Sequence, residues 1–232
     1  MEVQVWLRWY TRILDDFGFD RRADEESASY LDAFLREHGC LRVDDIDVPS
    51  SDFIVFGAGP SLRSHLKRFR ALDEPMTVIS ADGATTALLE EDVLPDIIVT
   101  DLDGKMEDII EANRQGAVVV VHAHGNNLPA LRRYLPLLQN IIGTTQSIPH
   151  GCLHNFGGFT DGDRAVFLAA ALGAGRIVLA GMDFGEVVTR YSRPDMDSEL
   201  GPADPVKRLK LEYASRLIDW LERNGDVRIE RW

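Results

Sequence analysis

The chain has 232 residues, of which 45% are hydrophobic and 27% are charged, so it can bury a substantial core and is not wholly disordered. Its net charge of -13 disfavours binding to nucleic acid or to anionic membranes. No apolar stretch approaches the roughly 18 residues that a membrane span needs, and the N-terminus lacks the pattern of a signal peptide. We therefore expect a cytoplasmic globular protein.

Two amphipathic helices are predicted at the N-terminus. In the first, apolar residues recur at steps of three and four and form one stripe, at Trp6, Trp9 or Tyr10, Ile13 and Phe17. This spacing predicts core packing for the two tryptophans. A second helix is expected from about Asp24 to His38, with Gly39 as its stop. Residues 1–45 are predicted to form a helical segment that serves as a cap or a dimer surface, which leaves a homo-oligomer open.

From residue 50 to 232 the pattern predicts one α/β domain. Short β-branched runs predict strands at 53–56, 77–80, 97–100, 117–122, 140–144, 176–180 and 227–229. Helices are predicted near 61–71, 83–92, 105–115, 128–138, 162–173 and 205–224. Runs such as 118–121 are apolar on both faces, as in strands buried between two layers of helices. This alternation predicts a doubly wound, mostly parallel, Rossmann-like sheet.

The two cysteines, Cys40 and Cys152, are too few for a disulfide framework or a cysteine zinc site. We expect both to be reduced, partly buried thiols. Cysteine chemistry is therefore not expected to contribute to the fold or the site.

Polar and glycine-rich residues follow six of the predicted strands. Ligands bind beyond the carboxyl ends of the strands in such a sheet, so these segments are candidates for the active site. They are residues 57–61, 82–83, 101–104, 122–127, 144–146 and 181–183.

The turn Gly57-Ala58-Gly59-Pro60-Ser61 joins a strand to a helix. Its glycines permit close approach of a ligand, Pro60 suits a first helical turn, and Ser61 can cap the helix or donate to an anion. It matches neither the dinucleotide fingerprint nor a P-loop. Phosphate binding and a purely structural turn are equally compatible with the sequence.

Asp101 and Asp103 form a D-x-D pattern directly after the strand 97–100. The pattern alone is weak evidence, because it also occurs at 45/47, 161/163 and 195/197. Its position at a strand end, where Asp82 from the neighbouring strand would converge, is the stronger signal. Three carboxylates beside a phosphate site suit Mg²⁺, which prefers hard oxygen ligands.

His122 and His124 follow the next strand. An extended H-x-H directs both rings to one side, so a zinc site is geometrically feasible, but no third soft ligand lies nearby in the sequence. Either ring would equally orient a hydroxyl group or neutralise a phosphate.

The segment Asn155–Arg164 opens a predicted helix. Asp161 would serve there as the N-cap. Alternatively, two phenylalanines around a glycine pair, followed by two carboxylates, suit a flat heterocycle with ring N–H donors.

Seven strings in this order, GAGPSL, ADGA, PDIIVTDLDG, HAHGNN, GTTQ, NFGGFTDGDRA and AGMDFG, closely resemble the archaeal 6-hydroxymethyl-7,8-dihydropterin pyrophosphokinases of the MptE type. The resemblance covers roughly residues 50 to 225. The part ADGA…PDIIVTDLDG is also similar to thiamine pyrophosphokinase, and this similarity implies that Asp82, Asp101 and Asp103 bind magnesium. One departure is Asn126, where the family pattern has an aspartate. A hydrogen-bonding role there would tolerate the amide, whereas an essential base would not.

The resemblance implies that the hydroxymethyl group of a reduced pterin attacks the β-phosphorus of ATP and releases AMP, with Mg²⁺ as cofactor, on the way to a folate or a methanopterin. The implied catalytic residues are Asp101, Asp103, His122 and His124. Implied ATP or phosphate ligands are Gly57, Gly59, Pro60, Ser61, Asp82, Gly83 and Asp183. Implied pterin ligands are Thr144, Thr145, Gln146, Asn155, Phe156, Gly157, Phe159, Thr160, Asp161 and Asp163.

Three alternatives remain open at this point. The domain also resembles the core of flagellin-modifying sugar-transfer proteins, although those proteins are much longer. A thiamine diphosphokinase would carry an all-β domain, which no residues after 205 supply. A nucleotide-binding regulator without activity would have lost the metal carboxylates, and none is lost here.

Overall fold

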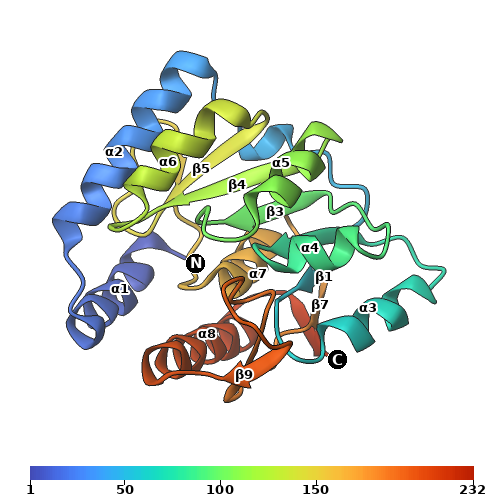
Figure 1. Cartoon of the computed structure of the whole chain (residues 1–232). Coiled ribbons are helices and arrows are strands. Elements are labelled where there is room, and N and C mark those ends of the chain that lie inside the picture. The colour runs from blue at the N-terminus through green and yellow to red at the C-terminus, as the bar shows by residue number, and fades with distance from the viewer.

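Eight parallel strands form the central sheet of the computed structural model, which describes residues 1–232 (Figure 1). The strands are β1 (Asp52–Phe56), β2 (Thr77–Ala81), β3 (Ile97–Thr100), β4 (Val118–Ala123), β5 (Ile141–Thr145), β6 (Leu153–His154), β7 (Arg176–Ala180) and β10 (Arg228–Arg231). They lie in the order β10-β7-β1-β2-β3-β4-β5-β6. The chain thus moves outward from β1 to β6 and then returns to the other side of β1, so the order reverses between β1 and β7. The carboxyl ends near such a reversal are the usual place for a ligand.

Helices cover both faces of the sheet, which confirms the doubly wound α/β prediction. One face packs against α1 (Val3–Phe17), α7 (Asp161–Ala171) and α8 (Pro205–Asn224). The other face packs against α2 (Arg21–His38), α3 (Leu62–Arg70), α4 (Ala84–Leu89), α5 (Met106–Arg114) and α6 (Leu128–Tyr134). Two short 3₁₀ helices lie at Val43–Asp45 and Leu135–Leu137. None of the helices has the length and apolar character needed to cross a membrane.

Alternate residues of the strands enter different cores, which explains their continuous apolar runs. In β4, Val120 belongs to the core under α1, α7 and α8, whereas Val119 and Val121 belong to the core under α2, α5 and α6. Strands buried on both faces have no polar side, so their sequences show no alternation.

The two N-terminal helices pack into these same cores. Trp6, Tyr10 and Ile13 of α1 are fully buried, which confirms the predicted core packing for Trp6, whereas Trp9 and Phe17 are partly buried and pack against the same core. Helix α2 begins three residues earlier than predicted because the side chain of Asp20 accepts a hydrogen bond from the backbone N–H of Arg22 and caps it. The boundary between residues 45 and 50 stays a prediction.

Three short strands were not predicted. They are β6 at the sheet edge and the antiparallel pair β8 (Val187–Thr189) and β9 (Leu200–Pro202). Strands of two or three residues are too short to show a hydrophobic period, so the sequence reads as a loop there.

The prediction of two reduced thiols is wrong for this structure, because Cys40 and Cys152 form a disulfide. Cys40 follows the end of α2, and α2 packs across β5 and β6, beside which Cys152 lies. The side chain of Asp32 in α2 also accepts a hydrogen bond from the backbone N–H of Cys152, at 2.7 Å. The pairing is a tertiary contact between residues 112 positions apart, which a count of cysteines does not reveal.

Candidate functional site

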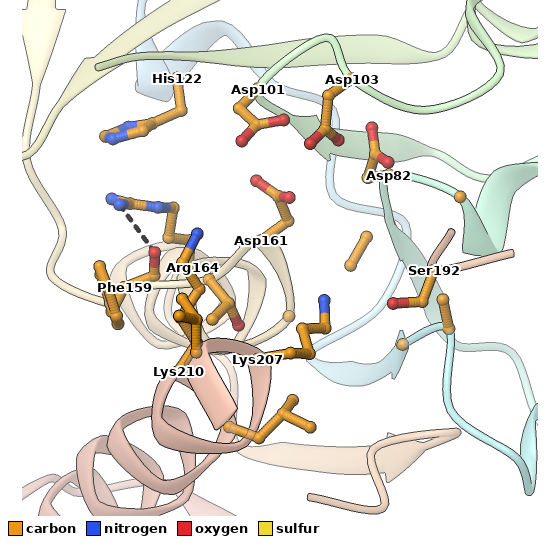
Figure 2. Close-up of a pocket in the computed structure, with 18 of the residues that line it drawn as sticks. Asp82, Asp101, Asp103, His122, Phe159, Asp161, Arg164, Ser192, Lys207 and Lys210 are labelled. Carbon is orange, nitrogen blue, oxygen red and sulfur yellow. Dashed lines mark hydrogen bonds between the residues drawn. The ribbon is translucent and has the colours of Figure 1, made fainter. Parts of the chain in front are cut away.

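A cavity of about 580 Å³ opens at the carboxyl ends of the strands, where the sequence predicted the site. Loops after β1, β2, β3, β4, β5 and β7 line it, together with the connection between α1 and α2 and the beginnings of α7 and α8. Figure 2 shows Asp82, Asp101 and Asp103 on one side of this space and Lys207 and Lys210 on the other, with Asp161 between them.

Three carboxylates, those of Asp82, Asp101 and Asp103, converge in the cavity, with one oxygen of each lying within 4.8 Å of the others. Asp101 and Asp103 flank Leu102, which is buried in the core and takes a left-handed conformation with φ 70°. This conformation costs about 1–2 kcal/mol for a residue other than glycine. The buried side chain of Leu102 holds the turn that carries the two carboxylates. At Gly104, a β-carbon would lie 2.4 Å from Asp82 Oδ2, so only glycine lets Asp82 approach this turn.

The three carboxyl groups have strongly divergent pKa values. Burial, followed by the charge of Asp101, raises the pKa of Asp82 to about 6 and that of Asp103 to about 8. Burial also acts to raise the pKa of Asp101, but the hydrogen bond from His124 and its charge prevail and lower it to about 2. In addition, Asp101 Oδ1 is buried without a hydrogen-bond partner. Such a set of hard oxygen donors fits a divalent cation of the magnesium type, which would relieve their mutual repulsion.

His122 and His124 contact different partners. His122 Nδ1 lies 3.1 Å from Thr144 Oγ1, and that hydroxyl group donates to the carbonyl of Val121, so it accepts from the ring. His122 Nε2 is consequently an acceptor, and it is buried without a partner. Burial, followed by the charge of Arg164, lowers the pKa of His122 well below its ordinary value, so this ring is neutral and is not a source of positive charge.

His124 instead contacts the carboxylate cluster, with its Nε2 3.0 Å from Asp101 Oδ2. Neither histidine belongs to a group of three potential metal ligands, so the zinc alternative gains no support from the geometry. Asn126 lines the cavity, is exposed, and makes no side-chain hydrogen bond within the protein.

The turn 57–61 is held closely by the loop after β7. The backbone N–H groups of Gly57 and Gly59 donate to the carbonyl groups of Ala180 and Gly181, and Pro60 has no N–H group. Asp183 Oδ2 accepts from both the N–H and the hydroxyl group of Ser61, at 3.1 and 3.0 Å. Most donors of the turn are therefore already bonded within the protein.

All of the predicted pterin residues except Asp163 fall into two groups. Gln146, Phe159, Thr160 and Asp161 line the main cavity. Thr144, Thr145, Asn155, Phe156 and Gly157 surround a second space of only about 10 Å³.

Asp163 lines neither cavity, and its contacts stabilise the start of α7. It is fully buried, and its two oxygens accept from the N–H groups of Phe159 and Thr160 and from the hydroxyl group of Thr160, at 2.6–2.7 Å. Thr160, and not Asp161, occupies the N-cap position of α7. The carboxylate of Asp161 therefore makes no hydrogen bond within the protein. Burial, followed by the charges of the carboxylate cluster, raises its pKa.

Several residues of the cavity were missed by sequence reasoning. Arg164 is buried and donates to Gln146 Oε1 at 3.1 Å and to the carbonyl of Phe159 at 3.0 Å, the latter bond being drawn in Figure 2. Lys207 and Lys210 enter from the first turns of α8. The position of Arg164 at the end of the string NFGGFTDGDR was a signal that could have identified it as a site residue. Lys207 and Lys210 gave no such signal, because lysines on an amphipathic helix are usually exposed to solvent.

Asp24 is a further unpredicted residue beside the cavity. Although it belongs to α2, its carboxylate accepts from the backbone N–H of Gly125 at 2.7 Å, from Gln146 Nε2 at 2.8 Å and from the hydroxyl group of Tyr10 at 2.5 Å. The indole N–H of Trp6 donates to the carbonyl of Gln146 as well. The N-terminal helices therefore fix the position of Gln146 and the loop after β4.

Comparisons with known proteins indicate the family of the chain. The family described as MptE-like, 6-hydroxymethylpterin diphosphokinase, matches residues 33–189. A protein of Methanocaldococcus jannaschii named 6-hydroxymethyl-7,8-dihydropterin pyrophosphokinase is 43% identical over 237 aligned positions, covering 98% of both chains. A protein of Pyrococcus furiosus with the same name is 42% identical and covers 99% of this chain and 98% of its own.

Among solved structures, a Maf glycosyltransferase from Magnetospirillum magneticum AMB-1 is similar to 80% of this chain and 34% of that chain, with a TM-score of 0.48 and 18% identity. A similarity this distant has no bearing on function.

Proposed function

Because the chain belongs to the MptE-like family of 6-hydroxymethylpterin diphosphokinases, we propose that it transfers the terminal diphosphate of ATP to 6-hydroxymethyl-7,8-dihydropterin. The products are the pterin diphosphate and AMP. The observation that carries the proposal is the cluster of Asp82, Asp101 and Asp103, which faces unpaired lysines across a cavity large enough for both substrates. Typical ligand cavities measure about 300–1,000 Å³.

The carboxylate cluster would hold a magnesium ion. Bound there, the ion would offset the negative charge of the phosphate oxygens. Asp101 has a buried oxygen without a protein partner and is held by His124, so its orientation is fixed before any ligand arrives. The acidic net charge of the chain makes such local compensation necessary for a polyanionic substrate.

We assign the pterin to the part of the cavity near Phe159, Gln146 and Asp161. Phe159 would cover the ring, and Asp161 would accept from the ring N–H and amino groups, hydrogen bonds that favour its charged form. His122 Nε2 is an acceptor without a partner and would take a further donor of the substrate.

In this arrangement the hydroxymethyl oxygen forms a bond to the β-phosphorus. The bond from that phosphorus to the oxygen that bridges to the α-phosphate breaks, and AMP leaves. A carboxylate of the cavity takes the proton of the alcohol. The protein contributes mainly by orienting the two substrates and by compensating the charge of the phosphates, the principal requirements of phosphoryl transfer.

The identity of the released nucleotide tests the proposal directly. With ATP, Mg²⁺ and reduced hydroxymethylpterin, we expect one AMP for each pterin diphosphate, measured by chromatography. Activity should require a divalent cation and should vanish when the hydroxyl group of the pterin is removed. Release of ADP would indicate attack at the γ-phosphorus and a different reaction class. Turnover of a nucleotide-sugar without use of ATP would favour the glycosyltransferase alternative.

Asp161→Ala is expected to weaken pterin binding by about 10- to 100-fold and to leave nucleotide binding nearly unchanged, because a charged acceptor of two N–H groups is lost. Titration calorimetry with each ligand separately would measure this. Phe156→Ala provides the contrast, because Phe156 lies at the small second cavity. A larger loss for Phe156→Ala than for Asp161→Ala would place the pterin elsewhere.

A further inference from the structure

The cavity has few positively charged side chains, and only one of them, Arg164, is hydrogen-bonded within the protein. Seven aspartates line it, at positions 20, 24, 82, 101, 103, 161 and 183, against one arginine and two lysines. The guanidinium group of Arg164 is already bonded to Gln146 and to the carbonyl of Phe159. Lys207 and Lys210 make no ion pair within 4.0 Å and no side-chain hydrogen bond with the protein, although the charges of Asp161 and Asp103 act on Lys207. They are the uncommitted cations of the cavity.

The turn after β1 offers little to a phosphate in comparison. The N–H groups of Gly57, Gly59 and Ser61 are bonded within the protein, and Asp183 brings a negative charge to this turn. At Gly59 a β-carbon would lie 2.1 Å from Asp183 Oδ2, which shows how closely that carboxylate is packed. A phosphate chain would be repelled here, whereas the hydroxyl groups of a ribose would be accepted.

Lys207 is placed by a fixed helix start. Asp204 caps α8, because its Oδ1 accepts from the backbone N–H of Lys207 at 2.8 Å, and Asp204 is itself paired with Arg193. Figure 2 shows the Lys207 side chain extending into the cavity toward the space beside Asp161, across from Asp82 and Asp103. Lys210, one turn further on, lies 5.9 Å from the centres of the Phe19 and Phe159 rings, nearer to the aromatic part.

We propose that Lys207 binds the phosphate chain of the donor nucleotide, on the side opposite to Asp82, Asp101 and Asp103, with the nucleoside directed toward the 57–61 turn and Asp183. This assignment rests on the proposed function and adds a residue to its donor site. Lys207 lies outside residues 33–189, the part of the chain that the family description matches. The ammonium group of Lys207 has no ion-pair partner and faces a set of metal-type carboxylates, and every N–H group of the 57–61 turn except that of Ala58 is bonded within the protein. These three observations favour Lys207 over the turn as the contact for a polyanion.

The test compares ligands that differ only in their phosphates. The affinities of α,β-methylene-ATP, which blocks the transfer, and of AMP are measured by calorimetry in Mg²⁺ buffer for the unmodified protein and for Lys207→Met. We expect the analogue to bind about 10- to 100-fold more weakly to the variant, while AMP binding changes less than threefold, because AMP lacks the β- and γ-phosphates. Lys207→Arg should retain most of the affinity for the analogue, since it keeps the charge.

Arg208→Met is the matched control, because it removes one positive charge from the adjacent position of α8, where Arg208 pairs with Glu186 outside the cavity. It should bind both ligands normally. Equal losses of both ligands in Lys207→Met, or no loss of either, would overturn the assignment. The ratio of the two affinities is insensitive to a partial loss of folded protein. AMP formation by the unmodified protein tests the proposed function separately, so either idea can fail alone.

Discussion

Replacing Asp101 or Asp103 by asparagine is expected to lower turnover on the order of 10³-fold or more, without unfolding the protein. Each substitution keeps the shape of the side chain and replaces a carboxyl group that can ionise on a bound cation by a neutral amide, within a group of three whose oxygens lie within 4.8 Å. The loss would fall on the affinity for the cation and on the charge stabilisation of phosphoryl transfer. Initial rates of AMP formation over a range of Mg²⁺ concentrations would measure it.

The chain supplies its own control for this experiment. Asp195 and Asp197 form the same D-x-D pattern, but both are exposed on the connection between β8 and β9. Asp195→Asn and Asp197→Asn should retain normal turnover. If the Asp101 and Asp103 variants were equally active, the carboxylates of this cluster would be ordinary polar groups of the cavity and the proposed metal site would be wrong.

Asp163→Ala should lower the free energy of unfolding by about 3–5 kcal/mol, the largest stability effect that we expect in the site. The carboxylate is fully buried, and its removal leaves the N–H groups of Phe159 and Thr160 and the hydroxyl group of Thr160 without their acceptor. Arg164 would also lose a neighbouring negative charge. Urea denaturation followed by circular dichroism gives the measurement.

Asp161→Ala, two residues earlier on the same helix, is the matched comparison, because the carboxylate of Asp161 makes no hydrogen bond within the protein. It should cost little stability while weakening pterin binding. Asp163→Asn should fall between the two, since its amide oxygen can still accept from one or two of the donors. A stable Asp163→Ala protein that has lost only pterin binding would contradict the structural role and support direct contact with the ligand.

The sequence was most informative where local patterns determine structure. All seven predicted strands are present, because residues such as Val118–Val121 are apolar on both faces and are bounded by turns. The rule that ligands bind beyond the carboxyl ends of parallel strands predicted Asp82 and Asp101 together at that end of the sheet from the sequence alone. The motif strings were specific enough to indicate the family, which the comparisons confirm.

Only the tertiary structure decided which residues complete the cavity. Asp24 and Lys207 come from helices far from the motifs in sequence, and local periodicity carries no information about where such helices dock. The same holds for the pairing of Cys40 with Cys152. Within a motif, too, the sequence did not show that Phe159 would face the cavity while Phe156 would not, because glycines at positive φ precede Phe159 and redirect the chain. The sequence thus determined the sheet and the carboxylates at the carboxyl ends of its strands, whereas the cations and the aromatic side chain that line the cavity depended on long-range packing between elements that have no local signal in common.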